Sequence, residues 1–253
     1  MTAPKIGVQL QPQGTTTDQL RESWRAADAL GVDSLWLWDH FFPIYGDPGQ
    51  SHFEGYTLLA AMAVETAHAE IGALVTCGSY RNPDLLADMA RTIDHLSGGR
   101  FTLGLGAGWF ERDYAEYGYD FGTAPARLRL LGQALPRIKE RLGKLTPGPV
   151  GDLPILIGGA GEKVTLRLVA EHADAWNTFG PPERFAQKSA VLDSWCDRVG
   201  RDRASIERTV AIDPAGVDGW QAYVAAGADH IIVMTPAPFD LDPVARLLEW
   251  VRP

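Results

Sequence analysis

The stretch ILIGGAGEKVTLRLVAEHADAW, residues Ile155–Trp176, contains a strand, a turn and a helix in close succession. The apolar run at its start predicts a buried strand, and a helix is expected to open directly at Glu162-Lys163. Between the two lies Gly158-Gly159-Ala160-Gly161, a run of small residues that suits a tight connection. A chain built from such units folds as an α/β protein.

The turn in this unit has the chemistry of a phosphate cradle. Glycines let backbone N–H groups approach an anion closely, and the amino terminus of a helix adds a positive partial charge. Lys163 can add a full charge. We therefore predict that a cofactor phosphate binds at Gly158, Gly159, Ala160, Gly161 and Lys163, although the same turn also suits a plain connection between a strand and a helix.

Apolar strand-like runs alternate with helical patterns along the whole chain. The runs are Lys5–Leu10, Ser34–Trp38, Ile71–Thr76, Phe101–Leu105, Pro154–Ile157, Asp174–Asn177, Arg208–Ile212 and His230–Met234. Between them, apolar residues recur at spacings of three and four, as in Leu20, Trp24 and Ala27. Eight strand-helix units in 253 residues favour a (β/α)8 TIM-like barrel over an open doubly wound sheet. Because we find no linker and no low-complexity tract, we predict a single domain over residues 1–253.

The charge of the chain restricts its partners. A net charge of −9 argues against nucleic acid or an anionic membrane as the main partner, because both favour a basic surface. An anionic cofactor is still possible where a lysine or arginine opposes the global field. The amino terminus runs straight into a strand and no apolar run approaches about 18 residues, so we expect a cytoplasmic protein. Cys77 and Cys196 suggest neither a disulfide framework nor a zinc site.

The barrel interpretation can be tested within the sequence, because active sites lie at the carboxyl ends of barrel strands. Polar residues and glycines do gather at these positions: Asp39 and His40, Thr76-Cys77-Gly78, Gly106-Ala107-Gly108, the Gly158–Lys163 turn, and Asn177. The long connections 41–55 and 109–123 leave the same rim and could wall a pocket.

Each of these groups has a functional and a structural interpretation. His40 can exchange a proton near neutral pH and Asp39 can hold a polar group of a cofactor, or Asp39 caps a turn beside a structural histidine. The small residues Thr76-Cys77-Gly78 permit a bulge on which a flat ring rests, or form a simple exit turn. Gly106–Gly108 allows close approach of the backbone to a cofactor, or forms a tight loop.

Asp39, His40, His52 and Glu54 are of residue types that bind metals, so we considered them as ligands of a metal site. It lacks support, because the chain has no HxH at its first strand, no HExxH motif and no cysteine cluster. We therefore expect no metal.

Four segments together resemble the bacterial luciferase-like oxidoreductases, and in particular the branch that uses the deazaflavin F420. They are WLWDHFFPI (36–44), FEGYTLLAAMA (53–63), LVTCGSYRNPDLLADMARTIDHLSGGRFTLGLGAGWFERDYAEYGYDF (74–121) and PILIGGAGEKVTLRLVAEHADAWN (154–177). The resemblance covers about residues 5–180 and returns at YVAAGADHIIVM (223–234).

The resemblance implies a barrel, usually dimeric, with the deazaflavin lying across the strand ends. By position, Asp39 and His40 match a pair near the ring, and Thr76-Cys77-Gly78 matches a bulge that carries a non-prolyl cis peptide behind the ring. Gly106–Gly108 matches the loop beside the ribityl chain, and Gly158–Lys163 matches the phosphate cradle.

The chain also departs from its apparent relatives. Sugar-phosphate dehydrogenases of this family carry a Trp and a Glu where this chain has Ile44 and Trp109, which argues against glucose-6-phosphate as the substrate. The connections 143–153 and 213–218 are shorter than usual.

We therefore expect hydride transfer between F420 and a small organic substrate, with His40 in the proton step. The alternatives are an FMN-dependent monooxygenase on the same fold and a non-catalytic F420-binding protein.

Overall fold

The computed structural model describes residues 3–252, and in these residues every paired strand runs parallel to its neighbours. The sheet order is β3-β2-β1-β9-β8-β7-β6-β5-β4, and a further pairing of β3 with β5 closes it into a barrel. The strands are β1 (Lys5–Leu10), β2 (Ser34–Leu37), β3 (Glu70–Ala73), β4 (Thr76–Cys77), β5 (Phe101–Gly106), β6 (Ile155–Gly158), β7 (Ala175–Phe179), β8 (Glu207–Ile212) and β9 (His230–Thr235). Because β3 and β4 both pair with β5, they share one of eight positions within the described barrel. The predicted (β/α)8 fold is confirmed.

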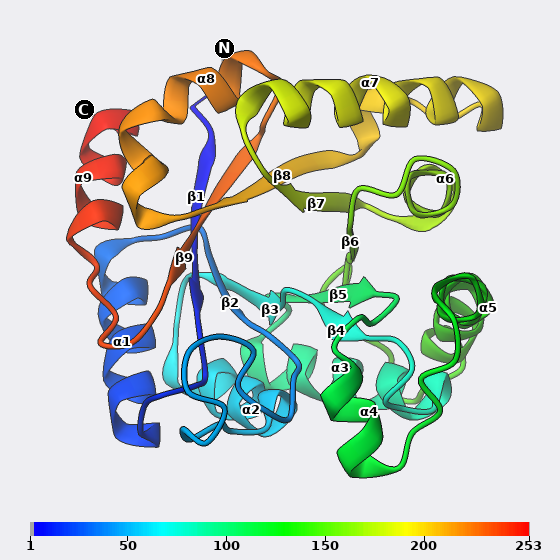
Figure 1. The fold of residues 1–253 in the computed structure, drawn as a ribbon, viewed down its shortest axis with the longest axis horizontal. Helices are drawn as coiled ribbons and strands as arrows, with labels where there is room; N and C mark the ends of the chain where they lie inside the picture. The colour runs from blue at the N-terminus through cyan, green and yellow to red at the C-terminus, as the bar shows by residue number, and fades with distance from the viewer. Residues whose placement is uncertain (1–2, 253) are drawn as a thin grey trace.

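Helices surround the barrel on all sides in Figure 1. They are α1 (Thr17–Leu30), α2 (Gly55–Glu65), α3 (Pro83–Ser97), α4 (Glu111–Tyr117), α5 (Ala124–Leu142), α6 (Thr165–His172), α7 (Pro182–Val199), α8 (Trp220–Ala225) and α9 (Asp242–Val251). Short 3-10 helices, Arg203–Ser205 and Pro214–Gly219, precede β8 and α8.

Local capping fixes several helix ends. The Asn82 side chain accepts a hydrogen bond from the Asp84 N–H, Pro83 occupies the first turn, and Gly98 ends α3 with φ of 68°. A reciprocal pair between Thr16 and Gln19 caps α1. Such caps satisfy backbone groups that the helix itself leaves unpaired, so short polar and glycine residues punctuate the chain at these points.

The core has two layers. The larger lies between the strands and the helices, and the smaller fills the barrel with Trp36, Leu156, Ile232 and their neighbours. Gly72 on β3 makes room for the indole, because a Cβ there would lie 2.6 Å from Trp36 Cζ3. Side chains thus fill the middle of the barrel.

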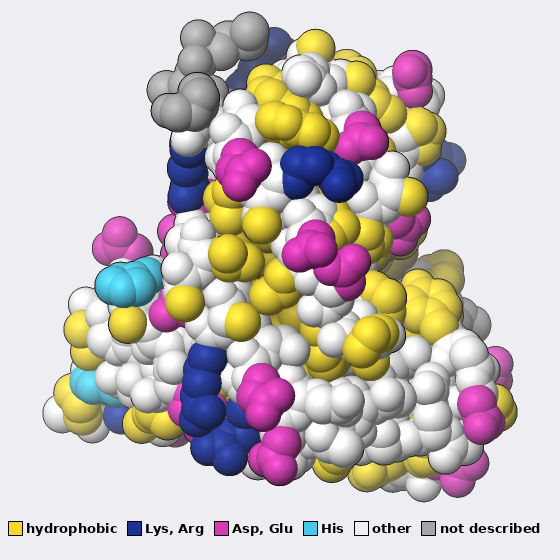
Figure 2. Space-filling view, turned by 90° about the vertical axis from the view of Figure 1, so that its left-hand side faces the viewer, with side chains coloured by type: hydrophobic (Ala, Val, Ile, Leu, Met, Phe, Trp, Pro, Cys, Tyr) yellow, Lys and Arg dark blue, Asp and Glu magenta, His cyan; other side chains and the backbone are white. Residues whose placement is uncertain are grey.

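The outer surface shows no single dominant charge on the face turned to the viewer in Figure 2, which is the α1 and α9 side of Figure 1. Acidic and basic side chains are scattered there among apolar ones. Among residues 3–252, no helix is both long and apolar enough to span a membrane.

Candidate active site

A cavity of about 350 Å³ opens at the carboxyl ends of the strands. Several predicted residues meet there although they are far apart in sequence: His40, Gly106, Ala107, Gly108, Gly158, Gly159 and Asn177 line it. The loops after β1, β2 and β5 contribute Gln11, Tyr45 and Trp109. Both long connections therefore wall the cavity, as the sequence predicted.

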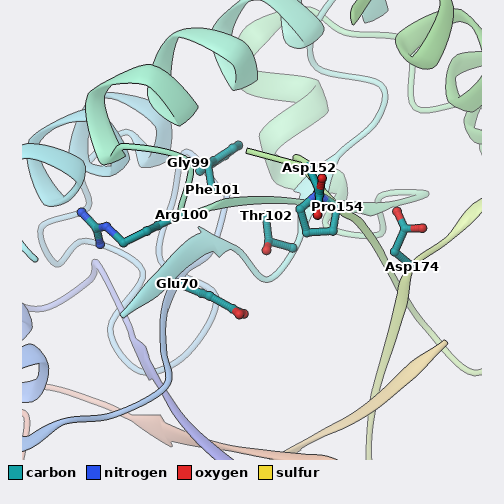
Figure 3. Close-up of a pocket in the computed structure, with 8 residues that line it drawn as sticks. All are labelled: Glu70, Gly99, Arg100, Phe101, Thr102, Asp152, Pro154 and Asp174. Atoms are coloured by element: carbon teal, nitrogen blue, oxygen red, sulfur yellow. The ribbon is translucent and has the colours of Figure 1, made fainter. Parts of the chain in front are cut away.

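A second cavity, of about 500 Å³, lies at the opposite end of the barrel. Figure 3 shows it with Glu70, Phe101 and Asp174, which begin or precede strands. Chemistry in barrels of this kind takes place at the carboxyl ends of the strands. The candidate active site is therefore the first cavity.

His40 follows β2 and is held in place by Asp113 of α4. Nδ1 of the imidazole lies 2.7 Å from Oδ2 of the carboxylate, and both side chains are almost fully buried. The ring also meets three aromatic rings edge-on, those of Trp38, Trp109 and Phe110. The orientation of His40 is thus fixed from several sides.

Asp113 accepts four hydrogen bonds. Besides His40, the Tyr80 hydroxyl donates to Oδ2 at 2.7 Å, and the N–H groups of Phe41 and Phe42 donate to Oδ1 at 3.1 Å each. Burial raises the pKa of the Asp113 carboxyl, but the hydrogen bonds from His40 and Tyr80 outweigh burial and hold that pKa below its usual range. Because an ionised carboxylate only accepts, the hydrogen sits on Nδ1 of His40, and Nε2 is the nitrogen left to face a ligand.

Asp113 and Tyr80 were not among the site residues predicted from the sequence. Asp113 lies within the connection 109–123 that was expected to wall the pocket, but its partner is 73 residues away. The pairing depends on two loops meeting over the barrel, for which the sequence carries no local pattern.

Asp39 is placed differently from the prediction that it holds a cofactor group. It is 1% exposed, and Arg81 donates to both of its oxygens, at 2.6 and 2.9 Å. The Cys77 N–H donates to Oδ2 as well. Arg81 also donates to Glu54 and lies over the Tyr56 ring. Asp39 therefore joins β2 to the loop after β4, and it is not among the residues that line the cavity.

The guanidinium of Arg81 is charged in this setting. Burial lowers its pKa, but the neighbouring Asp39 and Glu54 outweigh burial and hold the pKa of Arg81 above its usual range. Glu54 in turn accepts from the Tyr56 and Thr57 N–H groups at the start of α2. The Asp39–Arg81–Glu54 ion pairs therefore connect the end of β2, the loop after β4 and the start of α2.

The interruption predicted at Thr76-Cys77-Gly78 occurs two residues earlier. The non-prolyl cis peptide is Leu74–Val75, between β3 and β4, and both of these residues line the cavity. Thr76 and Cys77 instead pair with Leu105 and Gly106 of β5, and the Gly78 N–H donates to the Gly106 carbonyl. The Cys77 thiol lies 3.0 Å from the Tyr114 hydroxyl, and burial raises its pKa, so it is a packed thiol.

Val75 explains the glycines of β5 and β6. A Cβ on Gly106 would lie 2.7 Å from Val75 Cγ2, and one on Gly158 would lie 2.8 Å from Val75 Cγ1. At Gly104 a Cβ would meet the Ala73 carbonyl at 1.9 Å. These positions are glycine because the end of β3 and the segment that follows it, residues 73–75, occupy the space that a side chain would need.

Gly108 has a different constraint. Its φ is +83°, and a Cβ there would lie 2.0 Å from the Tyr114 hydroxyl. The loop after β5 therefore needs a glycine at 108 because Tyr114 of α4 packs against it.

The Gly158–Lys163 turn extends further than predicted. Helix α6 begins at Thr165, three residues after Glu162, and no side chain caps it. Gly158, Gly159 and Thr165 line the cavity, whereas Ala160 and Gly161 belong to the outer part of the turn. Lys188 of α7 donates to Glu162, and Trp195 donates to its carbonyl, so the turn is fastened to α7. Lys163 is exposed.

Two buried amides form part of the cavity lining. Gln9 donates to the Leu74 carbonyl at 2.8 Å, and Asn177 donates to the Thr209 hydroxyl at 2.7 Å. Both residues are 4% exposed, and both line the cavity. Asn177 was predicted as a site residue. Gln9 was missed, although a polar residue within the apolar run KIGVQL was a usable signal.

His52 lies beside this lining in a neutral form. Trp38 Nε1 donates to its Nε2 at 3.0 Å, and the two rings stack. Burial, followed by the nearby His40, lowers the pKa of His52 to about 4. Within residues 3–252, no group of three or more His, Cys, Asp or Glu side chains is arranged to hold a metal ion.

The sequence and the fold of the chain are both similar to those of known proteins. The model of the family described as luciferase-like monooxygenase matches residues 1–244. A 4-hydroxyprotoasukamycin monooxygenase of Streptomyces nodosus subsp. asukaensis is 28% identical over 232 residues, which cover 78% of this chain and 61% of the monooxygenase. The chain thus spans less than two thirds of the length of that relative.

Two solved structures have the same fold. An F420-dependent secondary alcohol dehydrogenase in complex with an F420-acetone adduct superimposes with a TM-score of 0.88 at 16% identity, with both chains covered completely. The oxygenating constituent of 3,6-diketocamphane monooxygenase from Pseudomonas putida, in complex with FMN, superimposes with a TM-score of 0.66 at 16% identity. The match covers 83% of this chain and 67% of that chain.

Proposed function

Since the chain belongs to the luciferase-like monooxygenase family, we propose that it is an oxidoreductase that transfers a hydride between coenzyme F420 and a small organic substrate. The observation that carries the proposal is His40, which lines the cavity and is fixed by the ionised Asp113. The full-length likeness to an F420-dependent enzyme supports F420 over other cofactors.

The residues present suit such a cofactor. Gly158, Gly159 and the Thr165 hydroxyl line one side of the cavity near the amino terminus of α6, where an anionic group is favoured, and Lys163 lies in the same turn. The amide oxygens of Gln9 and Asn177 offer acceptors to the N–H groups of a flat heterocycle. Val75 and Leu74 offer an apolar surface for such a ring.

A bound deazaflavin would supply the two-electron hydride acceptor or donor. The protein's part in the reaction is the proton. With the hydrogen of neutral His40 on Nδ1, Nε2 can accept the hydroxyl proton of an alcohol, and in the reverse direction the protonated Nε2 can return it to a carbonyl oxygen. Asp113 stabilises the imidazolium that forms, as a carboxylate within 2.7 Å favours the charged ring.

An FMN-dependent monooxygenase is the second candidate. The family as a whole and the Streptomyces relative carry the name monooxygenase, and one structural neighbour holds FMN. The turn at 158–161 suits the phosphate of either cofactor, so these residues do not separate the two. A non-catalytic F420-binding protein is the third candidate.

The test is a titration of the purified protein with F420 and with FMN, followed by absorbance and fluorescence. We expect F420 to bind at least about tenfold more tightly, a difference of about 1.4 kcal/mol. Reduction of bound F420 by an alcohol, read as loss of its absorbance, then supports hydride transfer. Tighter binding of FMN with substrate-dependent consumption of oxygen would establish the monooxygenase, and F420 binding without turnover would favour the carrier.

A further inference from the structure

Three large aromatic side chains stand at the mouth of the cavity and remain mostly exposed. Tyr45, Trp109 and Phe179 all line the cavity, yet they are 60%, 58% and 65% exposed. They come from the connection after β2, the loop after β5 and the end of β7. Exposed apolar side chains that converge on one opening indicate a surface that a ligand covers. We call these three residues the aromatic rim.

The aromatic rim is continuous with the proton-handling group. The Trp109 ring centroid is 5.7 Å from that of His40, and the Tyr45 centroid is 6.0 Å from that of Trp38, which itself meets His40 edge-on at 6.1 Å. A molecule that rests against the rim therefore extends toward His40.

Within residues 3–252, the lining of this cavity holds no Asp, Glu, Lys or Arg. Two acidic groups nearby have partners of their own: Asp113 contacts His40, and Asp39 contacts Arg81. Arg112 lies over the Phe42 ring and donates to the Pro48 carbonyl. Burial keeps His52 neutral by lowering its pKa to about 4.

Outside the turn at the amino terminus of α6, where the phosphate of the proposed cofactor would lie, a charged substrate group would lose its water without gaining a counterion in this lining. This argument applies to a carboxylate and to the ammonium form of an amine. An alcohol and its ketone are a neutral pair whose interconversion releases one hydride and one proton, as the proposed function requires.

We infer that the substrate is an uncharged alcohol, or the matching ketone, on a cyclic or aromatic skeleton, and that Tyr45, Trp109 and Phe179 select it. The inference rests on the proposed function. In the oxidation, the carbinol carbon gives its hydride to the oxidised cofactor, the hydroxyl gives its proton to Nε2 of His40, and a C=O bond forms. The aromatic rim contributes stacking on the face of the ring.

The test uses matched substrates on the F420-loaded protein. 1-Phenylethanol and mandelate share a skeleton and differ by a carboxylate, and 2-propanol lacks the ring. We expect kcat/KM to be at least about 100-fold higher for 1-phenylethanol than for mandelate, because an unpaired buried charge is costly. Trp109→Ala should lower kcat/KM for 1-phenylethanol about three- to tenfold, mainly through KM, and should affect 2-propanol much less. Trp109→Arg should narrow the gap between 1-phenylethanol and mandelate.

Trp250→Ala is the control, since Trp250 is 43% exposed on α9 and lies under Arg246 rather than at the cavity. Trp250→Ala should leave kcat/KM unchanged for both 1-phenylethanol and 2-propanol. Equal use of mandelate and 1-phenylethanol, or an equal loss for 1-phenylethanol and 2-propanol in Trp109→Ala, overturns the inference.

Ligand binding separates this inference from the proposed function. Acetophenone and phenylglyoxylate are titrated by calorimetry with and without F420. Tighter binding of acetophenone than of phenylglyoxylate, together with an affinity for acetophenone that falls in Trp109→Ala, supports the inference even if no alcohol is oxidised, in which case only the hydride-transfer proposal fails. Equal or tighter binding of phenylglyoxylate, or an unchanged affinity for acetophenone in Trp109→Ala, overturns the inference even if F420 is reduced by another substrate.

Discussion

Nδ1 of His40 lies 2.7 Å from Oδ2 of Asp113, and this contact decides which ring nitrogen faces the cavity. The carboxylate holds the hydrogen on Nδ1, so Nε2 is free to exchange a proton with a ligand. Asp113 acts through His40 and is a positioning residue.

Asp113→Asn should lower kcat about 100-fold, because a neutral amide neither stabilises the imidazolium nor enforces one tautomer. The affinity for F420 should change less than about threefold. Tyr80→Phe is the matched control, since it removes another donor to the same Oδ2 and leaves His40 in contact. The ¹⁵N shifts of the His40 ring report the tautomer without any turnover. An unchanged tautomer and unchanged kcat in Asp113→Asn would show that the contact is only structural.

His40→Asn should lower kcat about 10²–10⁴-fold, the range for loss of a positioned proton acceptor, while F420 binding changes much less. Steady-state kinetics with an alcohol found by screening, together with a F420 titration, measures both quantities. If binding collapses and the residual turnover is normal at saturation, His40 positions the ligand and another group handles the proton.

Gly106→Ala should reduce the free energy of unfolding by about 1–3 kcal/mol, because its new methyl meets Val75 Cγ2 at 2.7 Å. Val75→Ala in the same chain should recover most of the loss, with a coupling of about 1 kcal/mol or more. Gly104→Ala is the contrast, since its methyl meets the Ala73 carbonyl at 1.9 Å and no side-chain truncation relieves it. Urea unfolding of the single and double variants checks this, and equal losses with and without Val75 would refute the packing explanation.

Strand positions were predictable because their signals are local. The run 101–105 contains its own evidence, and the structure has β5 there. The start of α6 was misplaced because no capping side chain marks Thr165, so the glycine turn appeared to lead directly into the helix.

The details of the site were less predictable because they depend on long-range contacts. The Asp39 carboxylate looked available for a cofactor, but Arg81, 42 residues later, occupies both of its oxygens. Gly106 suggested close approach of the backbone to a cofactor, and the structure explains the lack of a side chain there by Val75 of the neighbouring segment. No sequence spacing encodes which side chain fills the space that a glycine leaves.

Lys163→Ala should weaken F420 binding only about two- to fivefold, because Lys163 is exposed and a solvated charge pair contributes about 0.2–1 kcal/mol. The effect should shrink as the salt concentration rises, since exposed charges are screened. Lys144→Ala serves as the control, because that lysine is 63% exposed and pairs with Glu140. A tenfold or larger loss that persists at high salt would mean that Lys163 becomes buried against the ligand.

His52 makes the stability of the protein depend on pH. Burial, together with the nearby His40, lowers its folded-state pKa from 6.5 to about 4, and Trp38 donates to its unprotonated Nε2. Between these pH values the unfolded chain binds a proton that the folded chain does not. The stabilisation is therefore complete above about pH 6.5 and is lost progressively as the pH falls toward 4, by about 1–3 kcal/mol after allowance for partial exposure.

Urea unfolding between about pH 7 and 4.5 measures how the free energy of unfolding depends on pH. His52→Gln should lose the part of this dependence that comes from His52, whereas His68→Gln, at an exposed site, should keep it. Carboxyl groups contribute mainly below this window, so an identical slope in His52→Gln and the wild type would show that His52 is already protonated in the folded protein.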